Sequence, residues 1–150
     1  MIIRRPAPSE HPAIRALIAS VVTEIYGSLW DTSSPPPVHE DWSRSWIAVD
    51  GGEPLGVLLT TDEWIDDLWI VSAQRGHGLG ARLLSLGEAE IAGRRLGVAR
   101  LRVVKLNVRA VSFYLDRGWQ FETEFQHEHL PVTMLQLRKR LDPLVRQTTS

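Results

Sequence analysis

The 150-residue sequence contains no cysteine. Disulfide bonds, thiolate metal sites and a covalent mechanism through a cysteine nucleophile are therefore excluded. The net charge is also small, −1 at pH 7 from 17 basic and 18 acidic side chains. Such a balance provides no general electrostatic attraction for nucleic acid or for an anionic membrane, so we expect neither as a partner.

The sequence also lacks a long apolar run. No stretch approaches the ~20 residues of a membrane-spanning helix, and the first residues, MIIRRPAPSEH, are too short and too polar for a signal peptide. We therefore expect a cytoplasmic protein. The length is typical of one domain with its own hydrophobic core, and we predict a single domain over residues 1–141 with a frayed tail over residues 142–150.

A glycine-rich stretch lies between an apolar run and a segment with helical periodicity. Gly76, Gly78 and Gly80 follow the apolar run of residues 65–71 and precede leucines at helical spacing. The first N–H groups of a helix have no partners within it, and the helix dipole places partial positive charge at this end. Glycines let several amides approach one anion, and Arg75 adds a permanent charge. The stretch predicts either a phosphate-binding helix terminus or a simple tight turn.

Hydrophobic periodicity predicts the order of the strands and helices along the chain. Ser9 is expected to cap the first helix, and the proline-rich segment of residues 28–42 is expected to be a loop, either for binding or for plain linkage. The predicted strands cover residues 2–3, 45–49, 55–61, 64–71, 98–106, 119–126 and 132–137. The predicted helices cover residues 9–27, residues 78–97 and a short segment around residues 110–114 that ends at Gly118.

With this order of elements, the sequence resembles the GNAT superfamily of acetyl-CoA-dependent N-acetyltransferases. RGHGLG at residues 75–80 is similar to the family signature R/Q-x-x-G-x-G/A, and NVRAVSFYLDRGW at residues 107–119 is similar to its N-x-x-A-x-x-F-Y stretch with a following Gly-aromatic pair. Ser72 and Ala73 stand where a proline often follows the strand, and Trp119 stands where phenylalanine is commoner. The resemblance implies a mixed α/β (α+β) fold with a centrally splayed sheet of about seven strands and about four flanking helices.

The resemblance also implies a binding site for acetyl-CoA as the cosubstrate. The amides of the glycine stretch would bind the pyrophosphate, and backbone groups of the fourth strand would bind the pantetheine arm. The Ile70 N–H would also polarise the thioester carbonyl. Asn107 would either hydrogen-bond this arm or cap the helix that follows it. The residues implied in cofactor binding are Leu68, Trp69, Ile70, Arg75, Gly76, His77, Gly78, Leu79, Gly80, Ala81 and Asn107.

Tyr114 matches the tyrosine of the second family motif, and the resemblance implies that it is the general acid. When an amine attacks the thioester, the departing thiolate must take up a proton. A phenol of ordinary pKa ~10 can donate to a thiolate whose ordinary pKa is ~8.5. Periodicity alone favours Tyr114 as an ordinary half-buried aromatic residue of an amphipathic helix, and it is the match to the family tyrosine that favours the general acid.

The attacking amine must also lose a proton. At an ordinary pKa of ~10.4 it is neutral about four times in ten thousand at pH 7, which corresponds to ~4.6 kcal/mol. Asp62, Glu63, Asp66 and Asp67 cluster beside the fourth strand, and adjacent strand residues point to opposite faces, so only one of the last two can face the substrate. The resemblance implies Asp66 as the base, directly or through water. The alternative is that these carboxylates are solvated or ion-paired surface groups.

Other side chains give weaker indications. His127 and His129 would share one strand face, but no third ligand is evident and no metal site is predicted. The basic residues Arg94, Arg95, Arg100 and Arg102 form either a contact to the adenosine phosphate or a solvated face. Trp30 and Trp42 lie in or beside the proline-rich loop and would line an amine site or pack in the core.

The sequence thus predicts an N-acetyltransferase that moves an acetyl group from acetyl-CoA to a primary amine by direct attack. The acidic cluster favours a small cationic amine as the acceptor. A peptide or protein amine is the alternative within the enzyme class. A non-catalytic acyl-CoA-binding sensor and an unrelated phosphate-binding module are the alternatives outside it. A homodimer is compatible with the sequence, which leaves the oligomeric state open.

Overall fold

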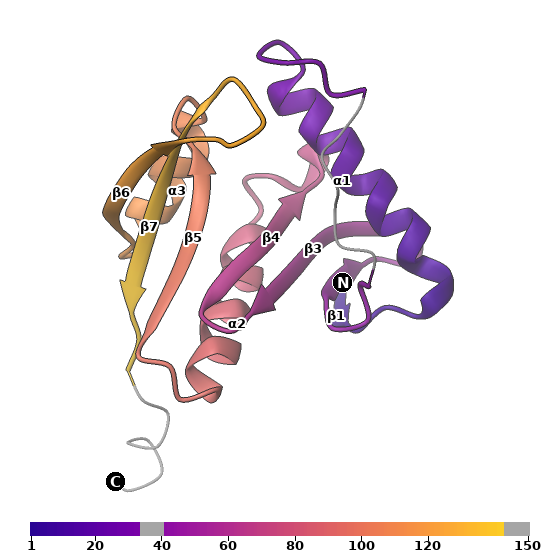
Figure 1. Cartoon of the computed structure of the whole chain (residues 1–150). Coiled ribbons are helices and arrows are strands. Elements are labelled where there is room, and N and C mark those ends of the chain that lie inside the picture. The colour runs from indigo at the N-terminus through magenta and orange to yellow at the C-terminus, as the bar shows by residue number, and fades with distance from the viewer. Residues whose placement is uncertain (34–40, 143–150) are drawn as a thin grey trace, which may run out of the picture. The chain divides into compact units, whose positions relative to one another are not determined.

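The computed structural model describes residues 1–33 and 41–142 (Figure 1). Residues 34–40 of the predicted proline-rich loop and nearly all of the predicted tail lie outside the described residues. Two short 3-10 helices cover Pro8–Glu10 and Ser72–Gln74. The other elements are β1 (Ile2–Arg4), α1 (His11–Tyr26), β2 (Trp46–Val49), β3 (Pro54–Thr61), β4 (Trp64–Ile70), α2 (Leu79–Gly93), β5 (Val98–Val104), α3 (Val108–Leu115), β6 (Gln120–Gln126) and β7 (Thr133–Arg140).

The seven strands form one mixed sheet in the order β1-β2-β3-β4-β5-β7-β6. The β4–β5 pair is parallel, whereas the β1–β2, β2–β3, β5–β7 and β6–β7 pairs are antiparallel. The predicted fold class is therefore confirmed, with three α-helices in the described residues where about four were expected. The β4–β5 register comprises only Trp64↔Arg100 and Ile65↔Leu101, which is short for two strands of seven residues each.

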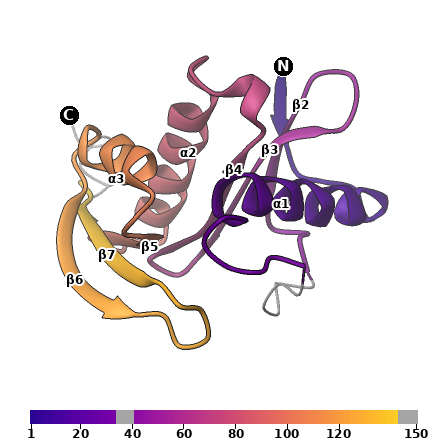
Figure 2. The ribbon, with the colours of Figure 1, turned by 90° about the horizontal axis from the view of Figure 1, so that it is seen from above.

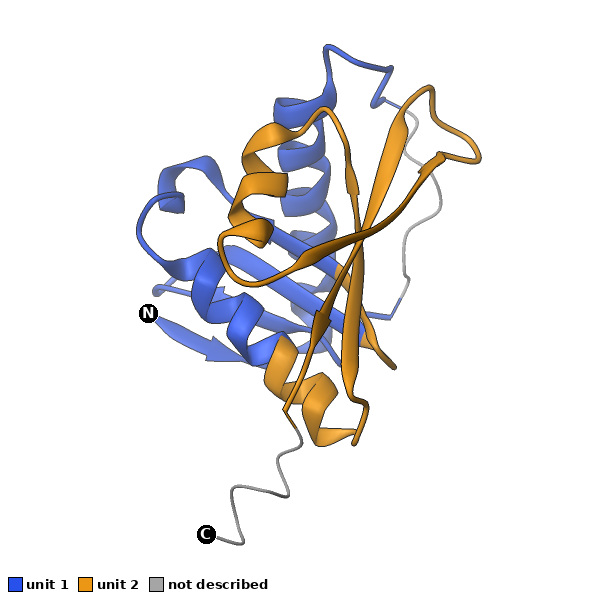
Figure 3. Cartoon of the chain, turned by 90° about the vertical axis from the view of Figure 1, so that its left-hand side faces the viewer, with its two compact units in different colours: residues 1–60, 67–87 blue, residues 61–66, 88–150 orange. Residues whose placement is uncertain are grey.

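The chain divides into two compact units (Figure 3). Unit 1 comprises Met1–Thr60 and Asp67–Gly87, and unit 2 comprises Thr61–Asp66 and Glu88–Ser150. The boundaries fall before the last residue of β3, within β4 and within α2, so each of these elements contributes residues to both units. The single domain over residues 1–141 stays a prediction.

In unit 1, α1 packs its apolar stripe onto one face of β2 and β3. Ile14, Leu17, Ile18 and Val21 recur at helical spacing, and all four are buried. Their cluster also contains Ile47, Val49, Val57, Leu59 and Trp42. Burying one large aliphatic side chain stabilises a protein by about 1.5–3 kcal/mol, so this cluster dominates the stability of the unit. Trp42 is a core residue, as expected from one of its two interpretations.

The start of α1 differs from the prediction. Ser9 lies inside the 3-10 helix and does not cap α1, which begins at His11. Glu10 directly precedes α1, but its carboxylate does not cap that helix: it accepts hydrogen bonds from the Ala7 N–H (2.8 Å), at the start of the 3-10 helix, and from the Arg4 guanidinium (2.8 and 3.0 Å). The Arg4 hydrogen bond is the main cause that lowers the Glu10 pKa to about 2.

The opposite face of β3 and β4 is covered by the first half of α2 (Figure 2). Gly56 on β3 lies directly under this helix. An ideal Cβ at this position would approach Ile70 Cδ1 to 3.0 Å, Leu83 Cδ1 to 3.1 Å and Leu79 Cδ2 to 3.3 Å. The close approach of α2 to the sheet therefore requires a residue without a side chain at position 56.

In unit 2, α3 lies over one face of the β5–β7–β6 sheet (Figure 2). The buried side chains of this unit include Leu101 and Val103 on β5, Leu137 on β7 and Trp119 before β6. They share the face that α3 covers, because alternate residues of a strand point to the same side. Arg100 and Arg102 therefore belong to the other face of β5.

The strand β6 departs from the strict alternation predicted for residues 119–126. A bulge between Phe121 and Thr123 shifts the register, so that Phe121 pairs with Leu137 and Phe125 pairs with Met134. Because these partners are an odd number of residues apart on β7, the two phenylalanines lie on opposite faces. The end of α2 also differs from the prediction: the helix stops at Gly93 rather than near Gly97, and Arg95 adopts a positive φ of 63°.

We predict that Gly56→Ala destabilises the protein by about 1–3 kcal/mol, because the added methyl group would push against three packed side chains. The measurement is the free energy of unfolding in urea. Gly52→Ala is the matched control, because a Cβ at Gly52 would meet no atom within 4 Å. Equal stability of the two variants would contradict the packing described for α2.

Candidate functional site

The turn between β4 and α2 adopts the geometry that its glycines predicted. Gly76 and Gly78 have φ angles of +79° and +85°, values at which residues with side chains are strained. A Cβ on either glycine would meet no atom within 4 Å, so the requirement for glycine here is conformational and not steric. The backbone of this turn borders open space.

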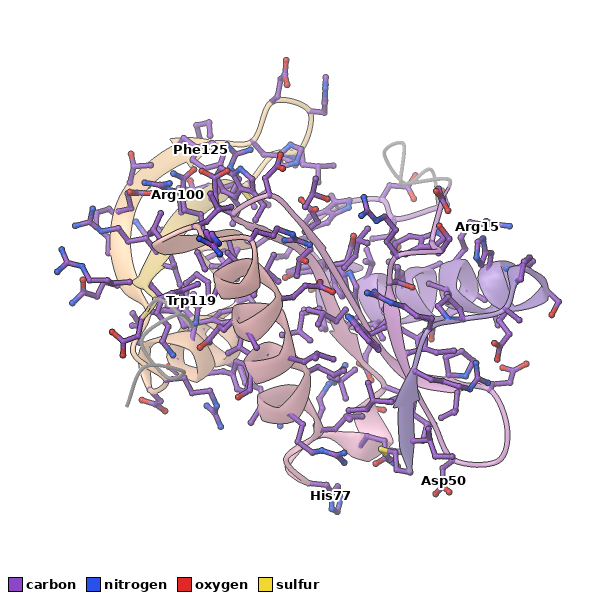
Figure 4. All side chains as sticks on the ribbon, turned by 90° about the horizontal axis from the view of Figure 1, so that it is seen from below. Arg15, Asp50, His77, Arg100, Trp119 and Phe125 are labelled. Carbon is purple, nitrogen blue, oxygen red and sulfur yellow. The ribbon has the colours of Figure 1, made fainter. Side chains whose placement is uncertain are left out.

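The first hydrogen bond of α2 runs from the Arg82 N–H to the Gly78 carbonyl, at 3.1 Å. The amides of residues 79–81 therefore precede the internal ladder of the helix and have no acceptor within it. The side chain of His77 is exposed and points away from the protein at the tip of the turn (Figure 4). This arrangement has the backbone features of an anion site, namely a glycine turn that leads into a helix N-terminus.

Arg75 contacts both the strand and α1. Its Nη2 donates to Glu24 Oε1 at 2.6 Å and to the Ile70 carbonyl at 3.2 Å. The guanidinium charge beside the turn is thus shared with a carboxylate of α1. Sequence reasoning missed Glu24, because 51 residues separate it from Arg75 and no local pattern links them.

The predicted cofactor residues of β4 lie on different faces of the strand. Trp69 packs against the hydrophobic cluster that includes α1. Ile70 lies on the other face, where its Cδ1 is close to Gly56. Leu68, like Ile70, is half-buried and lies on that second face by alternation.

The four acidic residues around β4 have different surroundings. Asp66 is exposed, whereas Asp67 is half-buried and its Oδ1 accepts a hydrogen bond from Trp69 Nε1 at 2.9 Å. Glu63 forms an ion pair with Arg100 at 3.2 Å, and the Asp62 carbonyl accepts from Arg94 Nη1 at 2.7 Å. The interpretation as an ion-paired group is therefore confirmed for Glu63.

The short helix α3 carries Tyr114 and begins at Asn107. The Asn107 Oδ1 accepts from the Ala110 N–H at 3.2 Å, so this side chain is an N-cap, one of its two predicted roles. Tyr114 makes edge-to-face ring contacts with Phe113 and Trp119, with centroid distances of 5.2 and 6.1 Å. Although α3 is amphipathic, none of its residues is buried. Its apolar face remains partly open.

Trp119, a departure from the family pattern, is almost fully buried at 2% exposure. Its Nε1 donates to Glu88 Oε2 at 3.1 Å, and Glu88 Oε1 accepts from Lys139 Nζ at 2.7 Å. Sequence reasoning did not identify Glu88 or Lys139. The available signal was the tryptophan itself, because a buried indole N–H usually has a hydrogen-bond partner.

The basic residues near β5 contact groups of the protein. Arg100 donates to Glu122 at 2.9 and 3.3 Å, and this hydrogen bond is the largest cause that lowers the Glu122 pKa. The Arg102 guanidinium lies 4.7 Å from the centre of the Trp64 ring and 5.3 Å from that of Phe125. Arg94, Arg95 and Arg102 are exposed, as the interpretation of a solvated basic face expects, whereas Arg100 is half-buried.

The prediction that His127 and His129 share a strand face is wrong, because β6 ends at Gln126, before both residues. His127 lies in the β6–β7 turn, where its Nδ1 accepts from the backbone N–H groups of His129 and Leu130, both at 3.0 Å. Within residues 1–33 and 41–142, no group of three or more His, Cys, Asp or Glu residues could hold a metal ion. None of the helices in this part of the chain is long and apolar enough to cross a membrane.

Comparisons with known proteins agree with this geometry. The model of the acetyltransferase (GNAT) family matches residues 15–119. YjaB from Escherichia coli, in its apo form, has a TM-score of 0.71 at 20% identity, covering 95% of this chain and all of YjaB. Nourseothricin acetyltransferase has a TM-score of 0.71 at 19% identity, with 94% of this chain and 98% of the other covered.

The NatC complex bound to Gag peptide and CoA also contains a similar chain, with a TM-score of 0.69 at 16% identity and coverages of 94% and 98%. At these identities the likenesses show the fold alone. A search of curated proteins found no match.

We predict that Gly78→Val weakens the binding of coenzyme A more than about tenfold, or ~1.4 kcal/mol, because valine does not tolerate a φ of +85° and would turn the amides away. Isothermal titration calorimetry measures this affinity. Gly51→Val is the matched control: its φ is +73° and its Cβ site is equally open, but it lies in the β2–β3 turn. Unchanged affinity in Gly78→Val would argue against the anion site.

Proposed function

Because the chain belongs to the GNAT acetyltransferase family, we propose that it transfers an acetyl group from acetyl-CoA to a primary amine. The observation that carries this proposal is the N-terminus of α2, where two glycines with positive φ precede amides that have no acceptor within the helix. A pyrophosphate is the anion that such a turn suits. The amides of Gly76, His77, Gly78, Leu79, Gly80 and Ala81 would bind it, with Arg75 beside them.

The partly open apolar face of α3 also supports the proposal. Ala110, Val111, Phe113 and Tyr114 are only half-buried in a helix whose amphipathic pattern favours burial. A pantetheine arm alongside this helix would cover that face. Asn107 would keep its capping bond to Ala110 and use its remaining hydrogen-bonding groups toward the cofactor. Leu68, Trp69 and Ile70 would contribute backbone groups.

The reaction would proceed by direct transfer. The amine lone pair attacks the thioester carbonyl carbon, and the carbonyl oxygen gains negative charge, which the Ile70 N–H would stabilise. The C–S bond then breaks, the acetyl group remains on the nitrogen, and Tyr114 protonates the departing thiolate. The absence of cysteine from the chain fits a mechanism without an acyl-enzyme.

Asp66 remains our candidate for the group that removes the proton from the attacking amine. Its exposure suits a residue that receives a substrate from solvent, directly or through a water molecule. Asp67 is the competing candidate. It points to the opposite face of β4, so only one of the two carboxylates can face the substrate, and its Oδ1 accepts a hydrogen bond from Trp69. The carboxylates near β4 would attract a cationic acceptor in either case.

We infer a small cationic amine as the acceptor, and the fold likeness to nourseothricin acetyltransferase is compatible with a small acceptor. A peptide amine is the second candidate, and it is favoured by the likeness to a chain of the NatC complex bound to Gag peptide and CoA. The deciding experiment measures release of the coenzyme A thiol from acetyl-CoA with polyamines, aminoglycosides, amino acids and peptides. Thermal stabilisation by acetyl-CoA without turnover on any acceptor would instead indicate a sensor.

We predict that Tyr114→Phe lowers kcat at least about a hundredfold, because the thiolate would lose its proton donor. Stabilisation by acetyl-CoA should persist in this variant, since the phenyl ring retains the packing of α3. The control is Tyr26→Phe, which keeps the ring that stacks on Trp30 at 4.8 Å. Full turnover in Tyr114→Phe would contradict the general-acid role of Tyr114.

We also predict that Asp66→Asn removes the fall in kcat/KM toward low pH, because the fall reports protonation of the base. Asp67→Asn should leave this limb of the pH profile in place. The measurement is a pH profile of kcat/KM for both variants under identical conditions. The opposite pattern would transfer the role to Asp67, and an unchanged limb in both would exclude both carboxylates as the base.

A further inference from the structure

The Glu88 carboxylate on α2 holds two side chains from other elements of unit 2. Its Oε2 accepts from the indole Nε1 of Trp119 at 3.1 Å, and its Oε1 accepts from Lys139 Nζ on β7 at 2.7 Å. The Glu88 side chain is only 16% exposed and the Lys139 side chain only 26%. A partly buried charge in this position is stabilised because both of its oxygens have donors.

Trp119 is in turn joined to the end of α3 through its backbone. Its N–H donates to the Tyr114 carbonyl and the Gly118 N–H donates to the Leu115 carbonyl, both at 3.2 Å. Gly118 has a φ of +91°, so this pair of bonds is the Schellman motif that ends a helix at a left-handed glycine. In this motif the residue after the glycine usually contacts the residue four positions before the glycine, and here these two residues are Trp119 and Tyr114.

That contact is present between the two rings. The Trp119 and Tyr114 rings meet edge to face, with an interplanar angle of 65°. Lys139 adds a second link to the same helix end, because its Nζ also donates to the Arg117 carbonyl at 2.8 Å. Lys139 of β7 therefore contacts the end of α3 directly, and Glu88 of α2 is linked to it through Trp119, which lies beside α2 in Figure 4.

We propose that Glu88 is a positioning residue for Tyr114: its carboxylate orients the Trp119 indole, and Trp119 orients the phenol-bearing turn of α3 through the ring contact and the helix cap. This proposal rests on the proposed function, in which Tyr114 protonates the thiolate. It gives a physical reason for tryptophan at position 119, because phenylalanine fills the space but cannot donate to Glu88.

The test compares Trp119→Phe, Glu88→Ala and Glu88→Gln in steady-state kinetics. We expect Trp119→Phe and Glu88→Ala to lower kcat by about tenfold to a hundredfold while KM for acetyl-CoA changes by less than about twofold, because a misplaced acid slows the chemical step without loosening the cofactor. Glu88→Gln should retain most of the activity, since its amide oxygen still accepts the indole N–H. The control on the same helix is Glu90→Ala, which affects the ion pair with Arg94.

The same variants made in a Tyr114→Phe background separate positioning from simple stabilisation. If Glu88 and Trp119 act through Tyr114, they should cause no further loss of kcat there, because residues that act as a unit are not additive. If these variants lower kcat as much in the Tyr114→Phe background as in the protein that retains Tyr114, the proposal is overturned. A rise in KM for acetyl-CoA that accounts for the whole defect would overturn it as well.

If Tyr114→Phe leaves turnover intact, the general-acid role fails. Whether Glu88 positions Tyr114 is then tested by the NMR signals of the Tyr114 ring. The chain has two tyrosines, so tyrosine-labelled NMR shows Tyr114 beside one internal reference, Tyr26. Glu88→Ala should shift or broaden the ring signals of Tyr114 and leave those of Tyr26 in place, whereas Glu90→Ala should affect neither. Unchanged Tyr114 signals in Glu88→Ala would overturn the positioning role.

Discussion

The structure depends most on a backbone constraint between β4 and α2, where the chain must leave a strand and start a helix within a few residues. Gly76 and Gly78 make this change through left-handed conformations. This turn has two structural consequences. It aligns the first turn of α2 with its amides toward solvent, and it lets Leu79 and Leu83 descend onto Gly56 on β3. The same turn therefore serves the packing of unit 1 and the anion site that we propose.

The candidate site combines rigid support with incomplete burial. In unit 1, α1 is held on β2 and β3 by a buried hydrophobic cluster. In unit 2, α3 is capped at both ends, by Asn107 at its start and by the Gly118 motif at its end. Yet no residue of α3 is buried. A helix that is fixed at its ends but open along its apolar face is prepared to contact a ligand without first being reorganised, and this preorganisation reduces the cost of binding.

The sequence predicted the elements well where the signal was local. Hydrophobic periodicity located all seven strands and the three helices, and the glycines located the turn before α2. Failures arose where distant residues decide the outcome. Ser9 was a reasonable cap, but it lies inside a 3-10 helix whose last residue, Glu10, pairs with Arg4. The bulge in β6 broke a clear alternation, and Glu88 was not identified because its partners Trp119 and Lys139 lie 31 and 51 residues away in the chain. Pairing energies of that kind leave no periodic pattern in a sequence.

The bulge in β6 has a consequence for how the protein behaves among its neighbours. β6 is the last strand of the sheet, so its outer backbone groups could pair with a strand of another molecule. The register shift between Phe121 and Thr123 interrupts the regular spacing that such pairing requires. At the other edge, β1 is only three residues long. Both ends of the sheet are thus poor templates for continuation, which protects a protein with several exposed apolar side chains from edge-to-edge aggregation.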